Sequence, residues 1–306
     1  MSVTQTFVNS EHTSIFERTK HLPGWQEPGD SFKLYEMGYQ AGDVILEIGT
    51  FGGRSAVVEL RGALANLDRT HPQFYGIDVD IQSIQRTANT LREAKLDEYA
   101  LLHYGTLETF LQEFSIQPTM VFVDGDHRYG GVKRDLELLT NVLTPGTPML
   151  CHDYMNPEND TGEMGVRQAV LEFVEAGYAE LIGTFGCSAF LITSARCQGI
   201  PKAKPAATDF TQQKQRSLEA VNTWLYRTWQ ECESDRAARL DAIHQLQQQL
   251  HQAFSELDKA QRQLQGTQAK VAAREARIAA MESSKFWQLR STWFKIKRVV
   301  GLGQNE

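Results

Sequence analysis

Short runs of aliphatic and β-branched residues alternate with segments of helical periodicity between residues 43 and 193. This alternation is typical of βαβ units, which build a mostly parallel sheet covered by helices. Seven strands are expected, at residues 43–48, 74–77, 99–104, 119–123, 147–151, 179–183 and 188–193. Only four residues separate the last two strands, too few for a parallel crossover, so these strands should form an antiparallel hairpin at the sheet edge. The sequence therefore predicts an α/β domain with a seven-stranded, mostly parallel sheet.

The composition changes after this predicted sheet. Residues 195–208 contain Gly199, Pro201 and Pro205, and they are expected to link a domain at 1–194 to a helical extension. Residues 209–282 contain no proline and predict one long helix or two. A solvated helix folded back on the domain is one interpretation. A coiled coil that makes the chain a homo-oligomer is the other, because apolar residues recur at every seventh position, at Ile243, Leu250, Leu257, Leu264, Val271 and Ile278.

The last segment, residues 283–306, differs in charge from the rest of the chain. The net charge of −7 argues against a nucleic-acid-binding surface over the whole protein. Residues 283–305 contain five basic residues and no acidic one. Large apolar residues recur there at helical spacing, so the tail should lie on an anionic membrane or dock on another protein or on this domain. These apolar residues are Phe286, Leu289, Trp293, Ile296 and Val300.

The sequence also bears on location. No apolar stretch is long enough to span a bilayer, and the N-terminus lacks the pattern of a secretory signal. The four cysteines lack the spacing of a disulfide framework and are expected to be free thiols. A cytoplasmic protein is therefore expected, in peripheral contact with the inner face of the membrane if its tail binds lipid.

A glycine-rich turn, EIGTFGGRS at residues 47–55, follows the first predicted strand. Glycines there let the backbone approach a ligand at the carboxyl end of the strand, and Asp78, after the second strand, is placed to bind ribose hydroxyls. The spacing G-x-x-G-G differs from the pyrophosphate-binding G-x-G-x-x-G, which disfavours NAD and FAD. S-adenosylmethionine has no phosphate, and Glu47 could accommodate its amino and sulfonium groups. An ordinary βα turn is the alternative.

This turn resembles motif I of class I S-adenosylmethionine-dependent methyltransferases, especially the catechol- and caffeoyl-CoA-type O-methyltransferases. The runs FVDGDHRYGGVKRD (122–135), LTPG (143–146) and CHDY (151–154) resemble a bacterial family that includes macrolide-sugar O-methyltransferases and cephalosporin hydroxylase-like proteins. The resemblance covers about residues 22–193 and implies a Rossmann-like methyltransferase fold. It also implies S-adenosyl-L-methionine as cofactor, in a pocket lined by Glu47, Gly49, Ser55, Asp78 and Thr106.

Asp124 and Asp153 lie at the carboxyl ends of the fourth and fifth predicted strands, so both carboxylates should face one cavity. Carboxylate oxygens suit Mg²⁺ or Mn²⁺, and related families place divalent-metal ligands at these positions. His152 is a candidate third ligand that would favour a softer ion, although alternation along the strand could turn it elsewhere. His127, where catechol-type enzymes have a lysine, is a candidate general base, and a structural histidine is the alternative.

The predicted function is O-methyl transfer to a hydroxyl of a small-molecule or glycan acceptor, such as a sugar in a glycan or secondary metabolite. The sugar rests on the resemblance alone. Two alternatives stay open: a hydroxylase-like relative of the same fold, and a non-catalytic coiled-coil scaffold that retains the fold. The polar residues expected at one sheet edge argue against a scaffold, which has no need of them.

Overall fold

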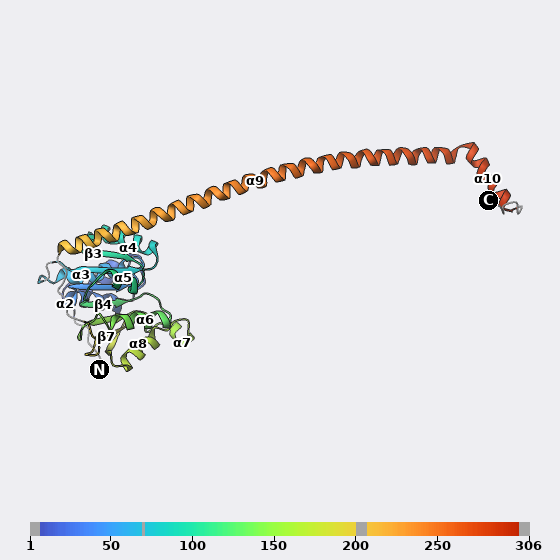
Figure 1. Ribbon diagram of the computed structural model, residues 1–306. Coiled ribbons are helices and arrows are strands. Elements are labelled where there is room, and N and C mark those ends of the chain that lie inside the picture. The colour runs from blue at the N-terminus through green and yellow to red at the C-terminus, as the bar shows by residue number, and fades with distance from the viewer. Residues whose placement is uncertain (1–6, 69–70, 200–206, 300–306) are drawn as a thin grey trace. The chain divides into compact units, whose positions relative to one another are not determined.

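The computed structural model describes residues 7–68, 71–199 and 207–299. Its centre is a seven-stranded sheet with the strand order β3-β2-β1-β4-β5-β7-β6 (Figure 1). The strands are β1 (Val44–Ile48), β2 (Gln73–Asp78), β3 (Ala100–Tyr104), β4 (Met120–Val123), β5 (Pro148–Cys151), β6 (Ala179–Phe185) and β7 (Ser188–Thr193). The first five strands are parallel, whereas β7 is antiparallel to both β5 and β6. The predicted sheet and its terminal hairpin are confirmed.

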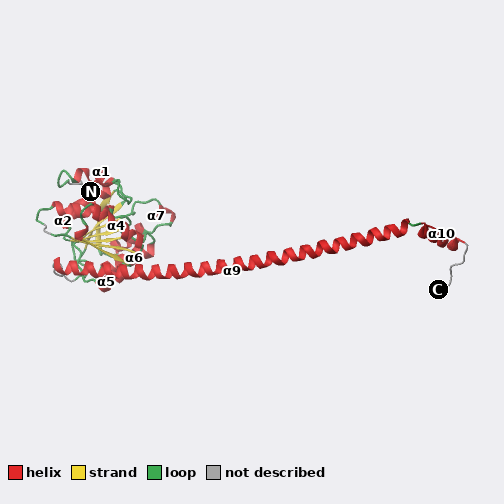
Figure 2. Cartoon of the chain, turned by 90° about the horizontal axis from the view of Figure 1, so that it is seen from above, coloured by secondary structure: helices red, strands yellow, loops and turns green. Residues whose placement is uncertain are grey.

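Helices cover both faces of the sheet (Figure 2). One face packs against α1 (Ile15–Thr19), α2 (Pro28–Ala41), α3 (Arg54–Ala65) and α4 (Ile81–Glu93). The other packs against α5 (Leu107–Glu113), α6 (Tyr129–Leu139), α8 (Val166–Glu175) and the first turns of α9 (Ala207–Ser283). Side chains alternate between these two cores along β1, which is buried at every position. The remaining short elements are η1 (His12–Ser14), η2 (Asp97–Tyr99) and α7 (Glu158–Thr161).

The sheet contains a topological switch point beside β1. The chain passes from β1 to β2 and β3 on one side, and returns to β4 and β5 on the other side. In an open α/β sheet this arrangement separates the loops after β1 and β4 and leaves a crevice at their carboxyl ends. The predicted cofactor turn follows β1, and the predicted metal ligands follow β4 and the adjacent β5, so the topology places both beside one crevice.

The chain divides into two units, Met1–Leu225 and Tyr226–Glu306. In the first unit, the start of α9 packs on the β2–β3 edge of the sheet. Phe210 is buried against the Tyr75 ring, and the Ser217 hydroxyl donates to the Leu102 carbonyl (2.7 Å). Residues 1–6 of the expected first domain and 200–206 of the expected linker lie outside the described residues.

In the second unit, α9 continues to Ser283 without a break, and α10 (Lys285–Val299) follows after Ser284. The six residues of the predicted heptad seam are all exposed in the single chain. Residues 300–306 of the expected tail, Val300 among them, lie outside the described residues. None of the described helices is long and apolar enough to cross a bilayer.

Candidate active site

A cavity of about 790 Å³ opens at the carboxyl ends of the parallel strands. Its volume lies within the usual range for small-molecule sites, roughly 300–1,000 Å³. Eight of the nine predicted site residues line it, and Glu47 does not. The eight are Gly49, Ser55, Asp78, Thr106, Asp124, His127, His152 and Asp153. One cavity therefore brings together the predicted cofactor residues and the predicted catalytic residues.

The turn between β1 and α3 lies so close to the end of β4 that its first residue must be glycine. Gly49 has a φ of +89°, and a Cβ atom built there would lie 2.0 Å from the Asp124 carbonyl oxygen. The Gly49 amide donates to the Ile77 carbonyl (2.8 Å), and the Asp124 amide donates to the Ile48 carbonyl (2.8 Å). The missing side chain therefore lets the ends of β1, β2 and β4 form one wall of the cavity.

Asp78 holds this turn through its carboxylate. Its Oδ2 accepts hydrogen bonds from the backbone amides of Thr50 and Phe51, both at 3.0 Å, and its Oδ1 accepts one from Asp80 (2.8 Å). Each carboxylate oxygen has two lone pairs, so these bonds leave capacity for a ligand hydroxyl. Thr106, on the same cavity wall, caps α5 by accepting from the Thr109 amide (3.2 Å). Both residues thus shape the cavity as well as line it.

Glu47 does not reach the cavity. Its side chain is fully buried, and its Oε1 accepts a hydrogen bond from the Ser55 hydroxyl. Burial raises the pKa of Glu47 well above its ordinary value, and the carboxylates of Asp124 and Asp78 raise it further. The side chain lies on the face of β1 that α3 covers, which is also the face of Ile45. The predicted direct contact between Glu47 and a cofactor does not fit this placement, and Glu47 instead positions Ser55.

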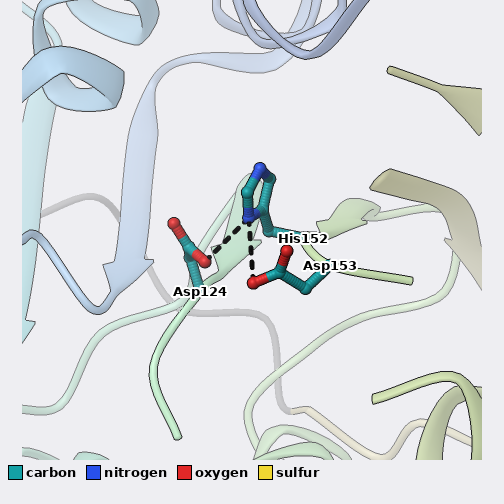
Figure 3. A group of neighbouring side chains, drawn as sticks. All are labelled: Asp124, His152 and Asp153. Atoms are coloured by element: carbon teal, nitrogen blue, oxygen red, sulfur yellow. Dashed lines mark ion pairs between the residues drawn. The ribbon is translucent and has the colours of Figure 1, made fainter. Parts of the chain in front are cut away.

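Asp124, His152 and Asp153 form a compact cluster just beyond β4 and β5 (Figure 3). His152 Nδ1 lies 3.1 Å from Asp124 Oδ1 and 3.5 Å from Asp153 Oδ2. The imidazole is 4% exposed, and its Nε2 lies 3.7 Å from Asp30 Oδ2. Burial opposes protonation of His152, but these carboxylates outweigh it and raise its pKa far above the ordinary value. The ring therefore points into the cluster, which strand alternation alone left open.

Asp153 adopts an unusual backbone conformation in this cluster. Its φ of +57° is left-handed, a region that residues other than glycine enter only at an energetic cost and often at functional sites. Its Oδ1 accepts a hydrogen bond from the Asn156 amide group (3.0 Å). Burial raises the pKa of Asp153, yet the His152 imidazole, the hydrogen bond from Asn156 and the charge of His127 lower it to about 2. This carboxylate is therefore held in its anionic form.

His127 approaches the same two carboxylates from the start of α6. Its Nε2 lies 3.4 Å from Asp124 Oδ1 and 3.5 Å from Asp153 Oδ2. The Asp124 carboxylate is the main cause of a raised pKa of His127, which burial partly opposes. The side chain is partly exposed, so the ring can contact both the cluster and a molecule in the cavity.

The donor set of this cluster fits a divalent cation. Two atoms that each lie about 2.1 Å from one ion, in neighbouring coordination positions, are roughly 3.0–3.4 Å apart. The distances from His152 Nδ1 to the two carboxylates agree with this spacing within about 0.1 Å. Neither His152 Nδ1 nor His127 Nε2 has a well-aligned hydrogen-bond partner among the described residues. A cation held by the two carboxylates would replace the proton on such a buried nitrogen, because an imidazole nitrogen must be neutral to coordinate a metal ion.

Comparison with known proteins bears on the identity of this cavity. Residues 46–154 match the family model described as a methyltransferase domain. These residues are a methyltransferase domain. The match confirms the methyltransferase predicted from the sequence, and it runs from β1 to the residue after Asp153, so it contains both halves of the cavity wall described above. No curated protein sequence matches the chain.

Solved structures similar to this methyltransferase domain and its surroundings include an O-methyltransferase from Bacillus cereus in complex with SAH. It shares 17% identity and a TM-score of 0.48, with 61% of this chain and 91% of that chain covered. Another is the O-methyltransferase TomG from Streptomyces achromogenes in complex with SAM, with 20% identity, a TM-score of 0.46, and 63% and 92% of the two chains covered.

Three residues in or directly behind the wall of the methyltransferase cavity were not predicted from the sequence. Asn156 lines the cavity and donates its side-chain amide to Asp153 Oδ1, and it follows Asp153 by only three residues in the sequence. Asp30, on α2, contacts His152 from a part of the chain more than 100 residues away, so no local pattern reveals it. Arg54 stands within the glycine-rich turn motif, but its buried position depends on α1 and the loop before α2.

Proposed function

We propose that the methyltransferase domain transfers the methyl group of S-adenosylmethionine to a hydroxyl oxygen of an acceptor. The observation that carries this proposal is the single cavity whose wall joins the Gly49 turn and Asp78 to the cluster of Asp124, His152 and Asp153. A methyl donor and a hydroxyl group must meet in line at about van der Waals distance for transfer, and a shared cavity supports this arrangement.

The turn side of the cavity fits the donor. Asp78 has one lone pair left, on Oδ1, for a ribose hydroxyl, and Gly49 leaves room for a ligand beside the backbone. Thr106 and Ser55 line the same side of the predicted pocket. The bound donor would supply an activated methyl group on a sulfonium, while these residues hold and orient it.

The cluster side of the cavity fits the acceptor hydroxyl. Asp124, Asp153 and His152 would hold a divalent cation such as Mg²⁺ or Mn²⁺, and the bound ion would lower the pKa of an acceptor hydroxyl. The predicted base, His127, has its Nε2 within 3.5 Å of both carboxylates, close enough to accept a proton from a hydroxyl held there. His127 must be neutral to act as a base, but the two carboxylates raise its pKa. A cation in the cluster would compensate their negative charge and so favour neutral His127.

The acceptor proposed here is a sugar hydroxyl of a glycan or secondary metabolite. The Trp25 indole is 60% exposed, lines the cavity and lies 5.5 Å, between ring centroids, from the His152 ring. An exposed aromatic ring beside a polar cluster suits a ligand with both an apolar face and hydroxyl groups, as a sugar has. Trp25 would cover the acceptor while its hydroxyl faces the cluster.

Binding of the donor tests this function directly. S-adenosylmethionine and S-adenosylhomocysteine are expected to bind in calorimetry, whereas NAD should not. Asp78→Ala removes a charged hydrogen-bond acceptor worth about 1.5–3 kcal/mol, so it should weaken donor binding about ten- to hundredfold. The control is Asp80→Ala, since Asp80 caps α4 and lies outside the cavity lining.

Several outcomes would contradict the proposal. Equal donor affinity in Asp78→Ala and the unchanged protein would remove Asp78 from the site. Absence of donor binding would favour the non-catalytic scaffold. Turnover that requires oxygen and 2-oxoglutarate would favour the hydroxylase-like alternative.

We further propose that α9 forms a homo-oligomeric coiled coil. The heptad residues Ile243, Leu250, Leu257, Leu264, Val271 and Ile278 lie on one continuous helix and are about half exposed in the single chain. A seam of this length would be buried by a second copy, which removes apolar surface from water. The second core position of each heptad is often polar and would weaken this seam without abolishing it. These positions are Leu240, Gln247, Phe254, Gln261, Gln268 and Glu275.

We also propose that the protein is cytoplasmic and that its tail holds it at the inner membrane surface. On α10, Phe286, Leu289, Trp293 and Ile296 are exposed large apolar residues at helical spacing. Five cations and no acidic residue accompany them on this helix. Basic helices with large aromatic residues bind the headgroup region of anionic bilayers.

Flotation with liposomes tests the tail. The full chain is expected to float with vesicles that contain anionic lipid, less so as salt rises, because salt screens the attraction. A chain that ends after Met281 should stay in solution. Equal flotation of both chains, or flotation that needs no anionic lipid, would show that α10 is not a lipid anchor of this kind.

A further inference from the structure

The first residue of α3, Arg54, is a buried cation at the wall of the cavity. The residue is 5% exposed, and it lines the cavity beside Gly24 and Ser55. Its Nη1 donates to the Gly24 carbonyl (3.3 Å), and its guanidinium carbon lies 5.0 Å from the centroid of the Phe16 ring. These two contacts, from the loop before α2 and from α1, fix the plane of the guanidinium.

The other edge of this guanidinium has no protein partner. Arg54 Nε and Nη2 are both buried and have no hydrogen bond within the part of the chain that the structure describes. Together, Nε and Nη2 form the edge of an arginine side chain that presents two parallel N–H groups. That edge matches the two oxygens of one carboxylate, in the bidentate pairing that arginine makes best.

The start of α3 adds partial positive charge at the same place. Gly53, the residue before the helix, offers no side chain to cap it, so the first amides of α3 receive no side-chain hydrogen bond there. A helix of 12 residues with an uncapped N-terminus favours an anion at that end. Arg54 is the first residue of α3 and lines the cavity, so the partial positive charge of the helix end adds to the charge of the guanidinium at this part of the wall.

A purely structural role leaves this arrangement unexplained. Burial disfavours a charged guanidinium, and it lowers the pKa of Arg54, an effect that the negative charge of Asp30 opposes. A side chain that only filled space between Phe16 and Gly24 would not need two buried N–H groups that lack a hydrogen-bond partner among the described residues.

We propose that the Nε–Nη2 edge of Arg54, with the first turn of α3, is a carboxylate-binding subsite of the cavity. The carboxylate can come from the amino-acid part of the methyl donor, in which case the inference rests on the proposed function, or from an acidic group on the acceptor. In both cases Arg54 binds and orients a ligand and takes no part in proton or methyl transfer.

Calorimetry with Arg54→Met tests the donor source. Methionine keeps much of the length and apolar contact of arginine but has no charge. We expect Arg54→Met to weaken S-adenosylhomocysteine about ten- to hundredfold and to leave 5′-methylthioadenosine unchanged, because the latter lacks the amino-acid carboxylate. Arg92→Met is the matched control, since Arg92 is exposed and lies outside the cavity lining.

Titration with sodium acetate at constant ionic strength tests the acceptor source. The observable is the Nε–H signal of Arg54 in the NMR spectrum. This signal is assigned by its absence in Arg54→Lys, and the titration is carried out on protein saturated with S-adenosylhomocysteine. A saturable shift of this signal would support a subsite for an acceptor carboxylate. If S-adenosylhomocysteine does not bind at all, the donor proposal fails, and the titration of the free protein still tests Arg54.

Thermal unfolding of the ligand-free protein separates a ligand-binding role from a structural one. If Arg54 serves a ligand, Arg54→Met removes an unpaired buried charge and should leave the melting temperature unchanged or raise it. If Arg54 has a structural role, Arg54→Met should instead lower the melting temperature.

The proposal is overturned if S-adenosylhomocysteine binds Arg54→Met and the unchanged protein equally and acetate does not shift the Nε–H signal. Should Arg54→Met fail to fold, the same comparisons are made with Arg54→Lys, which keeps the charge but not the bidentate edge.

Discussion

Asp153→Asn is expected to reduce methyl transfer about 10²–10⁴-fold while donor affinity stays within about twofold. Removing one anionic oxygen from the cluster of Asp124, His152 and Asp153 weakens a bound cation, and a metal ion stabilises the reacting oxygen by several kcal/mol. A chelator should have the same effect on the unchanged protein, and added Mn²⁺ should reverse it. The rate is measured as formation of S-adenosylhomocysteine with a hydroxylated acceptor found by screening.

The metal itself supplies a second measurement that needs no acceptor. Mn²⁺ bound to the protein, followed by electron paramagnetic resonance, should be lost in Asp153→Asn and retained in Asp160→Asn. Asp160 is a suitable control because its carboxylate is exposed on α7 and pairs with Arg167. Full activity in chelator, or equal Mn²⁺ binding by the two variants, would exclude a metal ion from the mechanism.

Gly49→Ala is expected to be the most destabilising of the single substitutions considered. A Cβ atom at this position would lie 2.0 Å from the Asp124 carbonyl oxygen, and the φ of +89° is already costly for any residue with a side chain. The backbone of β1 or β4 would have to move, so the free energy of unfolding should fall by more than about 3 kcal/mol. Donor binding should be lost as well, because the cavity wall depends on this close approach.

Substitutions at two other glycines distinguish the cost of the steric clash at Gly49 from the cost of its backbone conformation. Gly146 has a similar φ of +86° but no atom within 4 Å of a built Cβ, so Gly146→Ala should cost only about 1–2 kcal/mol. Gly130, which also has open space around a built Cβ, lies in α6, and Gly130→Ala should be neutral or slightly stabilising. Urea unfolding of the three variants measures the differences. A Gly49→Ala variant as stable as Gly146→Ala would show that the loops after β1 and β4 are less closely packed than described.

The local sequence determined the elements of the sheet domain. Apolar runs bounded by turn residues marked all seven strands, because burial on both faces requires such runs in a parallel sheet. It also determined that Asp124 and Asp153 would meet, since they follow strands that lie side by side, and the structure places them in one cluster. The homo-oligomer, the membrane contact and the roles of the site residues remain predictions.

Only the tertiary structure decided where three side chains point. His152 lies one residue beyond the end of β5, and the left-handed Asp153 follows it, so the alternation of a strand does not extend to this residue. Glu47 was expected in the cavity, but α3 covers its face of β1, and a strand pattern does not say which helix will cover which face. The free edge of Arg54 depends on Phe16 and Gly24, which are distant in sequence. Sequence therefore determined which groups are present at the sheet edge, and packing between distant segments decided which of them face a ligand.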